Sequence, residues 1–114
     1  MNDKFIIINL IKELINNFDK YLTNFPKSEI ELKHAIYENS YNMLKITYEA
    51  NTTYDVEKRK DLQDKIIASI KYLDYLVNRC YDKKIINSKK YLRFGECLEK
   101  ILRYLISWQN KTRA

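Results

Sequence analysis

Apolar residues recur every three or four positions in four stretches of the chain, which is the period of a helix with one apolar face. We therefore predict helices over residues 3–24, 28–51 and 55–84, and a fourth helix that begins near residue 88. The residues predicted to line the core, helix by helix, are Ile7, Ile11, Leu14, Phe18, Tyr21 and Phe25; Leu32, Ile36, Ser40, Met43 and Thr47; Leu62, Ile66, Ile70, Leu73, Val77 and Cys80; and Phe94, Leu98, Ile101, Leu105 and Trp108, widened by Tyr91, Leu102 and Ile106.

The connections between these helices are short, and their residues favour helix ends. Pro26 disfavours the helical conformation at the residue before it and so predicts the end of the first helix. Ser28 with Glu31 matches the capping box that begins a helix, and Ser88 is a candidate N-cap for the last helix. Because short connections reverse the direction of the chain, we predict an all-α, antiparallel up-and-down four-helix bundle, as a single domain over residues 1–114.

The second helix has another apolar face besides the one assigned to the core. Tyr37, Tyr41, Leu44 and Tyr48 recur at spacings of four, three and four residues on this second face. These residues could flank a broad core, because tyrosine tolerates half exposure. They could also form a subunit interface, where tyrosine is enriched because one part of its side chain is packed and the other is hydrated. Both interpretations remain open at the level of the sequence.

Composition places the chain among folded proteins, with 46% apolar and 32% charged residues in a length of 114. The net charge of +6 is concentrated in residues 78–114, which contain ten lysines and arginines but three acidic residues. Such a basic surface is typical of proteins that bind phosphates of nucleic acids. The residues predicted to contact nucleic acid are Arg79, Lys83, Lys84, Lys89, Lys90, Arg93, Lys100 and Arg103.

A different explanation of this charge is an ordinary solvated helix face. Glu96 with Lys100, and Glu99 with Arg103, are spaced four residues apart in the order that favours ion pairs on an exposed helix. The chain is also rich in Lys, Asn, Ile and Tyr together, a combination that an AT-rich genome favours without functional demand. Under this interpretation the protein does not bind nucleic acid.

Residues for catalysis or metal binding are sparse, and we predict a binding protein without catalytic residues, metal or cofactor. His34 is the only histidine, and a single histidine on a helix is usually a surface residue. Cys80 and Cys97 lack the spacing of zinc ligands and lie on apolar faces, which indicates buried reduced thiols, with a disulfide as the alternative. Gly95 stands alone within the last helix, where it indicates a close helix contact or a slight bend.

The first apolar run, "FIIINLI", is too short to cross a bilayer and has helical periodicity, unlike the core of a signal peptide. We therefore expect a cytoplasmic protein.

Residues 25–51, "FPKSEIELKHAIYENSYNMLKITYEAN", resemble a four-helix-bundle family. That family includes the accessory variability determinant of diversity-generating retroelements and the proteins encoded in intervening sequences of large-subunit ribosomal RNA. The shared features are the Phe-Pro-Lys-x-Glu corner before the second helix and, in the retroelement branch, the Glu-Ala-Asn sequence at its end, here Glu49, Ala50 and Asn51. The similarity continues through "KYLRFGECLEKILRYLISWQN", where Trp108 matches a tryptophan common near the end of the fourth helix.

This resemblance implies a small basic accessory protein that assembles into a ring-like homo-oligomer, which is a pentamer in the known retroelement members. It further implies that the protein associates with a reverse transcriptase and with RNA, and with DNA where cDNA is made, and supports cDNA synthesis from template RNA. The alternative branch implies an oligomeric interaction scaffold without nucleic-acid binding. The Glu-Ala-Asn sequence and the basic charge favour the retroelement branch.

Overall fold

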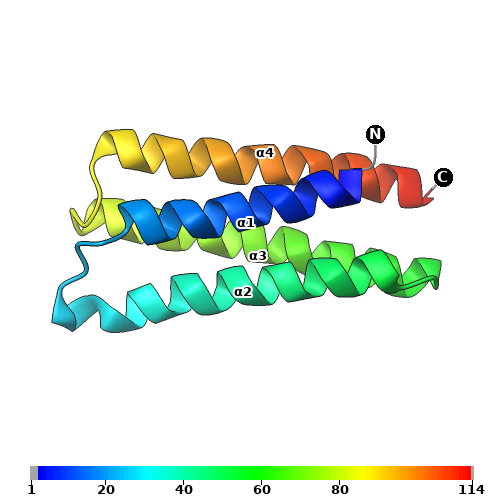
Figure 1. The fold of residues 1–114 in the computed structure, drawn as a ribbon, viewed down its shortest axis with the longest axis horizontal. Coiled ribbons are helices and arrows are strands. Elements are labelled where there is room, and N and C mark those ends of the chain that lie inside the picture. The colour runs from blue at the N-terminus through cyan, green and yellow to red at the C-terminus, as the bar shows by residue number, and fades with distance from the viewer. Residues whose placement is uncertain (1–2, 114) are drawn as a thin grey trace.

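The computed structural model describes residues 3–113, with side chains as far as Thr112. It contains four long helices, α1 (Asp3–Tyr21), α2 (Ile30–Thr52), α3 (Val56–Asp82) and α4 (Ser88–Arg113), and a short 3₁₀ turn, η1 (Lys27–Glu29). Successive helices run in opposite directions, and each packs against two neighbours, α1 against α2 and α4, and α3 against α2 and α4 (Figure 1). The predicted antiparallel four-helix bundle is confirmed.

The core lies along the bundle axis and is formed by the predicted apolar stripes of all four helices. Phe18 of α1 and Phe94 of α4 are fully buried, with ring centroids 5.0 Å apart. Burying one such side chain stabilises the folded state by about 1.5–3 kcal/mol. Ile106, predicted to widen the stripe of α4, is instead 43% exposed and does not pack against the core. Tyr21, Phe25, Leu32, Leu62, Tyr91 and Leu102 are half-buried at the margins of the core.

The core side of α2 is small and partly polar, and its hydroxyl groups bond within the helix. Ser40 Oγ donates to the carbonyl of Ile36 at 2.6 Å, and Thr47 Oγ1 donates to the carbonyl of Met43 at 2.8 Å. Both hydroxyls are fully buried. Because each donor has a partner one turn earlier, their burial leaves no donor unsatisfied.

Two helix caps do not form at the predicted residues. No side-chain cap bond forms at Ser28, because the chain first makes the 3₁₀ turn η1, in which the Glu29 amide donates to the carbonyl of Pro26 at 2.9 Å. At the start of α4 the cap is Asn87, whose Oδ1 accepts from the amide of Lys90 at 2.9 Å. Ser88 is therefore the first helical residue of α4, not its cap.

The caps of α3 combine a favourable residue at one end with an unfavourable one at the other. Asp55 Oδ1 accepts from the amides of Glu57 and Lys58, which is a regular N-cap. At the C-terminal end the amide of Ile85 donates to the carbonyl of Cys80, and the amide of Lys84 donates to that of Tyr81. This is the Schellman motif, and it holds Lys84 at a φ of 61°, in the left-handed region that glycine usually occupies.

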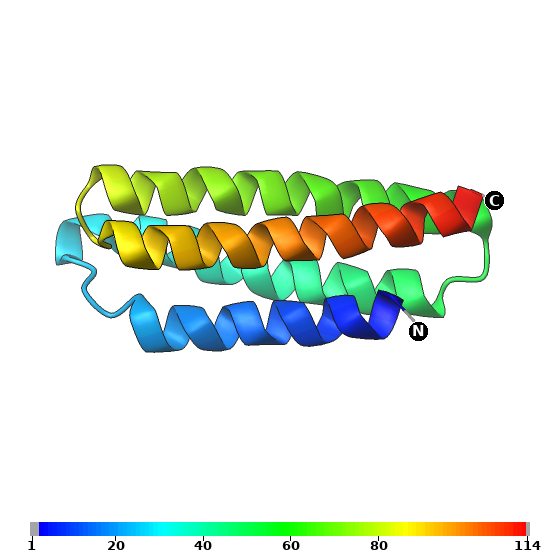
Figure 2. The same cartoon turned by 90° about the horizontal axis from the view of Figure 1, so that it is seen from above.

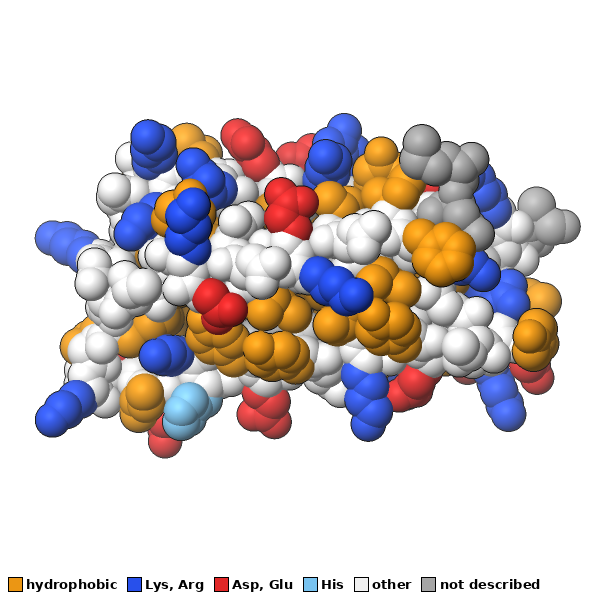
Figure 3. Space-filling model, in the orientation of Figure 1, with side chains coloured by type: hydrophobic (Ala, Val, Ile, Leu, Met, Phe, Trp, Pro, Cys, Tyr) orange, Lys and Arg blue, Asp and Glu red, His pale blue; other side chains and the backbone are white. Residues whose placement is uncertain are grey.

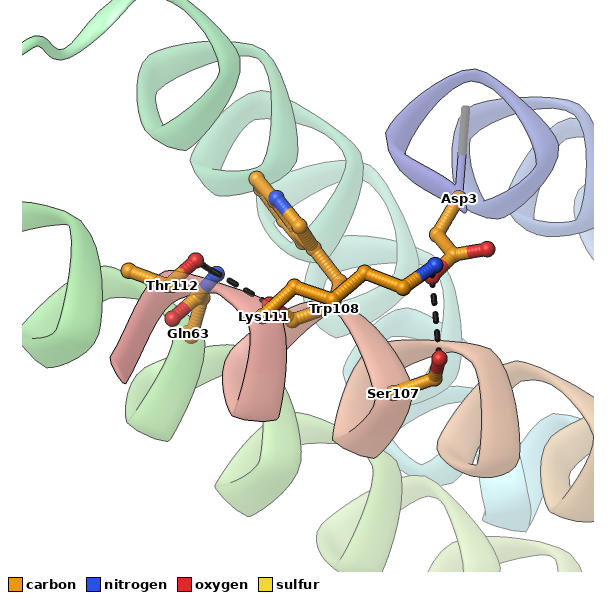
Figure 4. Close-up of polar contacts among 6 residues, drawn as sticks. All are labelled: Asp3, Gln63, Ser107, Trp108, Lys111 and Thr112. Carbon is orange, nitrogen blue, oxygen red and sulfur yellow. Dashed lines mark hydrogen bonds and ion pairs between the residues drawn. The ribbon is translucent and has the colours of Figure 1, made fainter. Parts of the chain in front are cut away.

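Polar contacts join α1 to α4 at the end of the bundle where the chain begins and ends (Figure 4). Asp3 Oδ2 accepts from Lys111 Nζ at 2.8 Å and from Ser107 Oγ at 3.0 Å. The hydrogen bond from Lys111 is the main reason why the pKa of the Asp3 carboxyl lies below its ordinary value; burial opposes this effect. On the α3 side, Gln63 Nε2 donates to Thr112 Oγ1 at 3.0 Å.

Gly95 does not mark a close approach between helices, contrary to one of the two predictions made for it. A methyl group added at its Cα would meet no atom within 4 Å outside the helix itself. The residue borders a shallow groove of about 300 Å³ between α3 and α4. The absent side chain therefore leaves space at the surface and is not required by the packing.

Candidate nucleic-acid interface

The bundle brings most of the predicted nucleic-acid-binding residues to one end. The α1–α2 and α3–α4 connections lie together at this end, and the α2–α3 connection lies at the other (Figures 1 and 2). Six of the eight predicted residues lie on the last turn of α3, the α3–α4 connection or the first two turns of α4. We call these six the corner cluster: Arg79, Lys83, Lys84, Lys89, Lys90 and Arg93. Figure 3 shows Lys and Arg side chains gathered over the beginning of α4 and the end of α1.

Arg93 is held in place by an uncharged partner. Its Nη1 donates to the hydroxyl of Tyr21 on α1 at 3.0 Å, and its guanidinium lies 4.5 Å from the centroid of the Tyr21 ring. Such a cation–π contact orients the guanidinium without neutralising it. Arg93 is exposed, so its charge remains available to an anionic ligand.

The remaining members of the corner cluster differ in their surroundings. Lys83 Nζ lies 2.9 Å from Glu29 Oε2 of η1, so an acidic partner already compensates its charge. Lys84 and Lys89 are exposed, whereas Arg79 and Lys90 are half-buried. Lys83 thus joins the end of α3 to η1 through a salt bridge. It is therefore the weakest candidate of the six for a phosphate contact.

Lys100 and Arg103 lie apart from the corner cluster, farther along α4. At a rise of about 1.5 Å per residue, Arg103 is roughly 15 Å from Arg93 along the helix axis. Both are exposed, and with Asp3 and Ser107 they border an open groove of about 390 Å³ on the α1 side of α4. The predicted residues of α4 therefore share one helix, and Lys100 and Arg103 extend the basic set beyond the corner cluster.

The ion pairs proposed for the alternative interpretation are not formed. Within the part of the chain that the structure describes, the salt bridges are Lys60–Glu57, Lys83–Glu29 and Lys111–Asp3. Neither Lys100 nor Arg103, both of them described, lies within 4.0 Å of the glutamate four residues before it. Neither cation is thus fixed in a salt bridge with that glutamate.

The four residues predicted as an oligomer interface lie along the seam between α2 and α1, and they divide into two pairs. Tyr37 and Leu44 are half-buried against the core. The Tyr37 hydroxyl donates to Asp19 Oδ1 on α1 at 2.8 Å, and burial, followed by this bond, raises the pKa of Tyr37. Tyr41 and Tyr48 are 55% and 44% exposed.

Figure 3 shows that hydrophobic side chains gather along this seam, with few charges among them. The Tyr41 ring stacks on Tyr37 at 6.4 Å between centroids, and Lys12 of α1 lies 5.8 Å from the centroid of Tyr48. Tyr37 and Leu44 therefore flank the core, as the first interpretation predicts, whereas the subunit interface stays a prediction, for which Tyr41 and Tyr48 remain exposed.

Sequence reasoning missed the roles of Tyr21 and of the pair Tyr81 and Tyr91 near the corner cluster. Tyr21 was assigned to the core of α1, and its role as the partner of Arg93 depends on a contact across 72 positions of sequence. Tyr81 and Tyr91 stack across the α3–α4 connection with centroids 4.6 Å apart. Tyr81 directly precedes the sequence "DKKIINSKK", and Tyr91 directly follows it. This symmetric position is the sequence signal that could have indicated the stacked pair.

The described residues hold no group of three or more His, Cys, Asp or Glu side chains that could bind a metal. Cys80 is buried, Cys97 is half-buried, and both thiols are free. Burial raises the pKa of each thiol to about 11, which keeps both protonated and poorly nucleophilic near neutral pH. His34 is exposed on α2.

No family model, curated protein or solved structure matches the chain. None of the described helices has an apolar stretch long enough to cross a membrane. Function is therefore inferred from the chemistry of the surfaces described above and from the resemblance noted for residues 25–51.

Proposed function

We propose that the protein is a non-enzymatic accessory protein of a diversity-generating retroelement. In this role it is a basic homo-oligomer that binds template RNA or cDNA and the reverse transcriptase of the element, and it supports mutagenic cDNA synthesis. The observation that carries the proposal is the corner cluster, whose exposed members Lys84, Lys89 and Arg93 lie together with no acidic partner within 4.0 Å among the described residues.

The electrostatics favour weak contacts by each subunit and stronger binding by an assembly. Phosphate contacts of this kind give dissociation constants on the order of 10⁻⁴–10⁻⁶ M at physiological salt. A symmetric ring repeats the basic surface, so that one long strand engages several copies, and each further contact is intramolecular. Linked sites of this kind raise the apparent affinity by roughly 10²-fold or more when the geometry allows.

The family resemblance supplies the biological setting. The Phe-Pro-Lys-x-Glu corner corresponds to the turn around Pro26 and η1, and the Glu-Ala-Asn sequence to the last turn of α2. Both are structural motifs, which is consistent with a protein that acts by binding. A reverse transcriptase gene and a pair of near-identical repeats beside this gene in the genome would support the retroelement assignment.

The second candidate function is an oligomeric scaffold of the ribosomal-RNA intervening-sequence type, without nucleic-acid binding. It is favoured by the exposed pair Tyr41 and Tyr48, which provides an apolar surface on α2 that includes no residue of the corner cluster. The two functions share the assembly and differ in the role of the basic surface.

A reconstituted cDNA synthesis reaction with the element's reverse transcriptase and template RNA distinguishes them. We expect wild-type protein to support synthesis and the double variant Arg93→Glu/Lys100→Glu to lose it. The matched control is Lys58→Glu/Lys65→Glu, which makes the same charge change at the same spacing on an exposed part of α3. If the first variant and the control are both as active as the wild type, the basic surface is not required and the scaffold function is favoured.

A further inference from the structure

An open groove of about 660 Å³ lies between the end of α3 and the beginning of α4, inside the corner cluster. Its size falls within the range of about 300–1,000 Å³ typical of pockets for small molecules. The mostly buried Ile85 and Ile86 line it together with Tyr81, Lys84 and Lys90. The groove thus combines an aromatic ring with two cationic side chains.

Tyr81 lines the groove, and one face of its ring is packed. That face stacks on Tyr91, with an interplanar angle of 15° and 4.6 Å between centroids. The Tyr91 hydroxyl donates to Asn78 Oδ1, and Asn78 Nδ2 donates to the carbonyl of Asp74 at 2.9 Å. Tyr81 remains 41% exposed. A ring supported in this way is preorganised to stack with a planar group.

The charges around the ring are suited to a phosphodiester strand. Lys84 is exposed and Lys90 is half-buried at the first turn of α4, where the helix dipole adds a partial positive charge. Asp82 is the one carboxylate that lines the groove, and Asn24 and Asn87 add uncharged polar groups. Lys84 occupies the left-handed position that glycine would hold with less strain, so the chain keeps a cation there at a cost in stability.

We propose that this groove binds one unpaired nucleotide of a single-stranded nucleic acid, with its base stacked on Tyr81 and the flanking phosphates near Lys84 and Lys90. The proposal rests on the proposed nucleic-acid-binding function and specifies how the strand is held. Stacking on an aromatic ring requires an exposed base face, which a duplex does not offer. Recognition by stacking accepts all four bases, so the site selects single strands and not a sequence.

The test compares Tyr81→Leu with Tyr81→Phe, using a fluorescently labelled single-stranded RNA, a duplex of the same sequence and an abasic strand of the same length. Replacing a stacking residue weakens binding by about tenfold per base. We expect Tyr81→Leu to lose about this factor for single-stranded RNA, Tyr81→Phe to bind as the wild type does, and neither to change the affinity for the abasic strand. Circular dichroism of both variants establishes that the helices are intact.

The salt dependence separates stacking from charge. Log K for single strands falls with log salt by about 0.7 for each phosphate that a cationic side chain neutralises. We expect Tyr81→Leu to leave this salt dependence unchanged. Lys84→Gln/Lys90→Gln is expected to make it less steep, by about 0.7 for each phosphate that the variant no longer neutralises. Wild-type binding that persists unchanged in Tyr81→Leu would overturn the stacking proposal and leave the proposed function standing. If the wild type binds no RNA even at low salt, the proposed function itself fails.

Discussion

Lys84 occupies a position at which stability and charge have opposite requirements. The Schellman motif that ends α3 needs a residue with φ near 61°, and there a side chain with a Cβ is strained. A lysine at this position adds charge to the corner cluster, in contrast to Lys83, whose charge is compensated by Glu29. Two adjacent lysines that are indistinguishable in the sequence therefore have different roles in the folded chain.

Replacing Lys84 with glycine tests this balance. Relief of the left-handed strain is expected to raise the free energy of unfolding by about 1 kcal/mol, and the melting temperature by about 4 °C for a chain of this size. Thermal unfolding at a fixed protein concentration measures the change. Lys83→Gly is the control, because the φ of Lys83 is −84° and glycine there lowers the stability. Equal stability of Lys84→Gly and wild type would show that this position carries no strain.

At the scale of the helices, periodicity in the sequence was sufficient to predict which faces are buried. Phe18, Ile36 and Leu73 are fully buried, as their stripes predicted. The helix ends were predicted less well, because a cap depends on backbone geometry that the residue type does not determine. Ser28 follows a proline that leads into a 3₁₀ turn, and Asn87 reaches the third amide of α4 one residue before the predicted cap.

Contacts between helices could not be predicted from the sequence, because periodicity does not fix which neighbour each face meets. The Arg93–Tyr21 contact and the Asp3–Lys111 ion pair both join α1 to α4, the first and last helices of the chain. They depend on the axial alignment of the two helices, to which many core side chains contribute. The basic face of α4 was therefore predictable, whereas the contact of Arg93 with Tyr21 of α1 was not.

The Asp3 contacts predict a dependence of stability on pH. Because the pKa of Asp3 is lower in the folded protein, its stabilising effect is fully present above its ordinary pKa of 3.8 and is lost as the pH falls below that value. At pH 6, Asp3→Asn is expected to lower the free energy of unfolding by about 1 kcal/mol, the typical value of a hydrogen-bonded charge at a partly exposed site. Near pH 2 the variant and the wild type are expected to be equally stable.

Urea unfolding at both pH values measures this difference. Asp61→Asn on the exposed side of α3 is the control, since no hydrogen bond or salt bridge involves the Asp61 side chain within the described part of the chain. If Asp3→Asn lowers the free energy of unfolding by the same amount at both pH values, the stabilising effect does not come from the charged carboxylate, and the prediction is contradicted.

At the scale of the whole molecule, the bundle carries two distinct surfaces. The corner cluster lies at one end, and the apolar seam between α1 and α2 runs along the side (Figure 3). The seam and the corner cluster are formed by different residues. The two surfaces can thus act together in the proposed assembly, one by joining subunits and the other by binding a strand.

The seam predicts an oligomer that depends on Tyr41. We expect light scattering at micromolar concentration to give a mass several times that of the 13.8-kDa chain, and Tyr41→Glu to reduce it to the mass of the monomer with helicity unchanged. Tyr75→Glu is the matched control, because Tyr75 is 56% exposed on α3 and Tyr41 is 55% exposed on α2. A wild-type monomer would contradict the assembly, and an oligomeric Tyr41→Glu would move the interface to another face.

Binding of a long single-stranded RNA tests the central claim most directly. The measurement is the affinity for a strand of about 50 nucleotides, long enough to engage several subunits, at roughly 0.15 M salt, where the screening length is about 8 Å. We predict tight, salt-dependent binding by the wild type and by Lys58→Glu/Lys65→Glu, and no detectable binding by Arg93→Glu/Lys100→Glu at an unchanged oligomer mass. Equal affinity of Arg93→Glu/Lys100→Glu and the wild type would show that the basic surface is only solvated, and it would contradict the account.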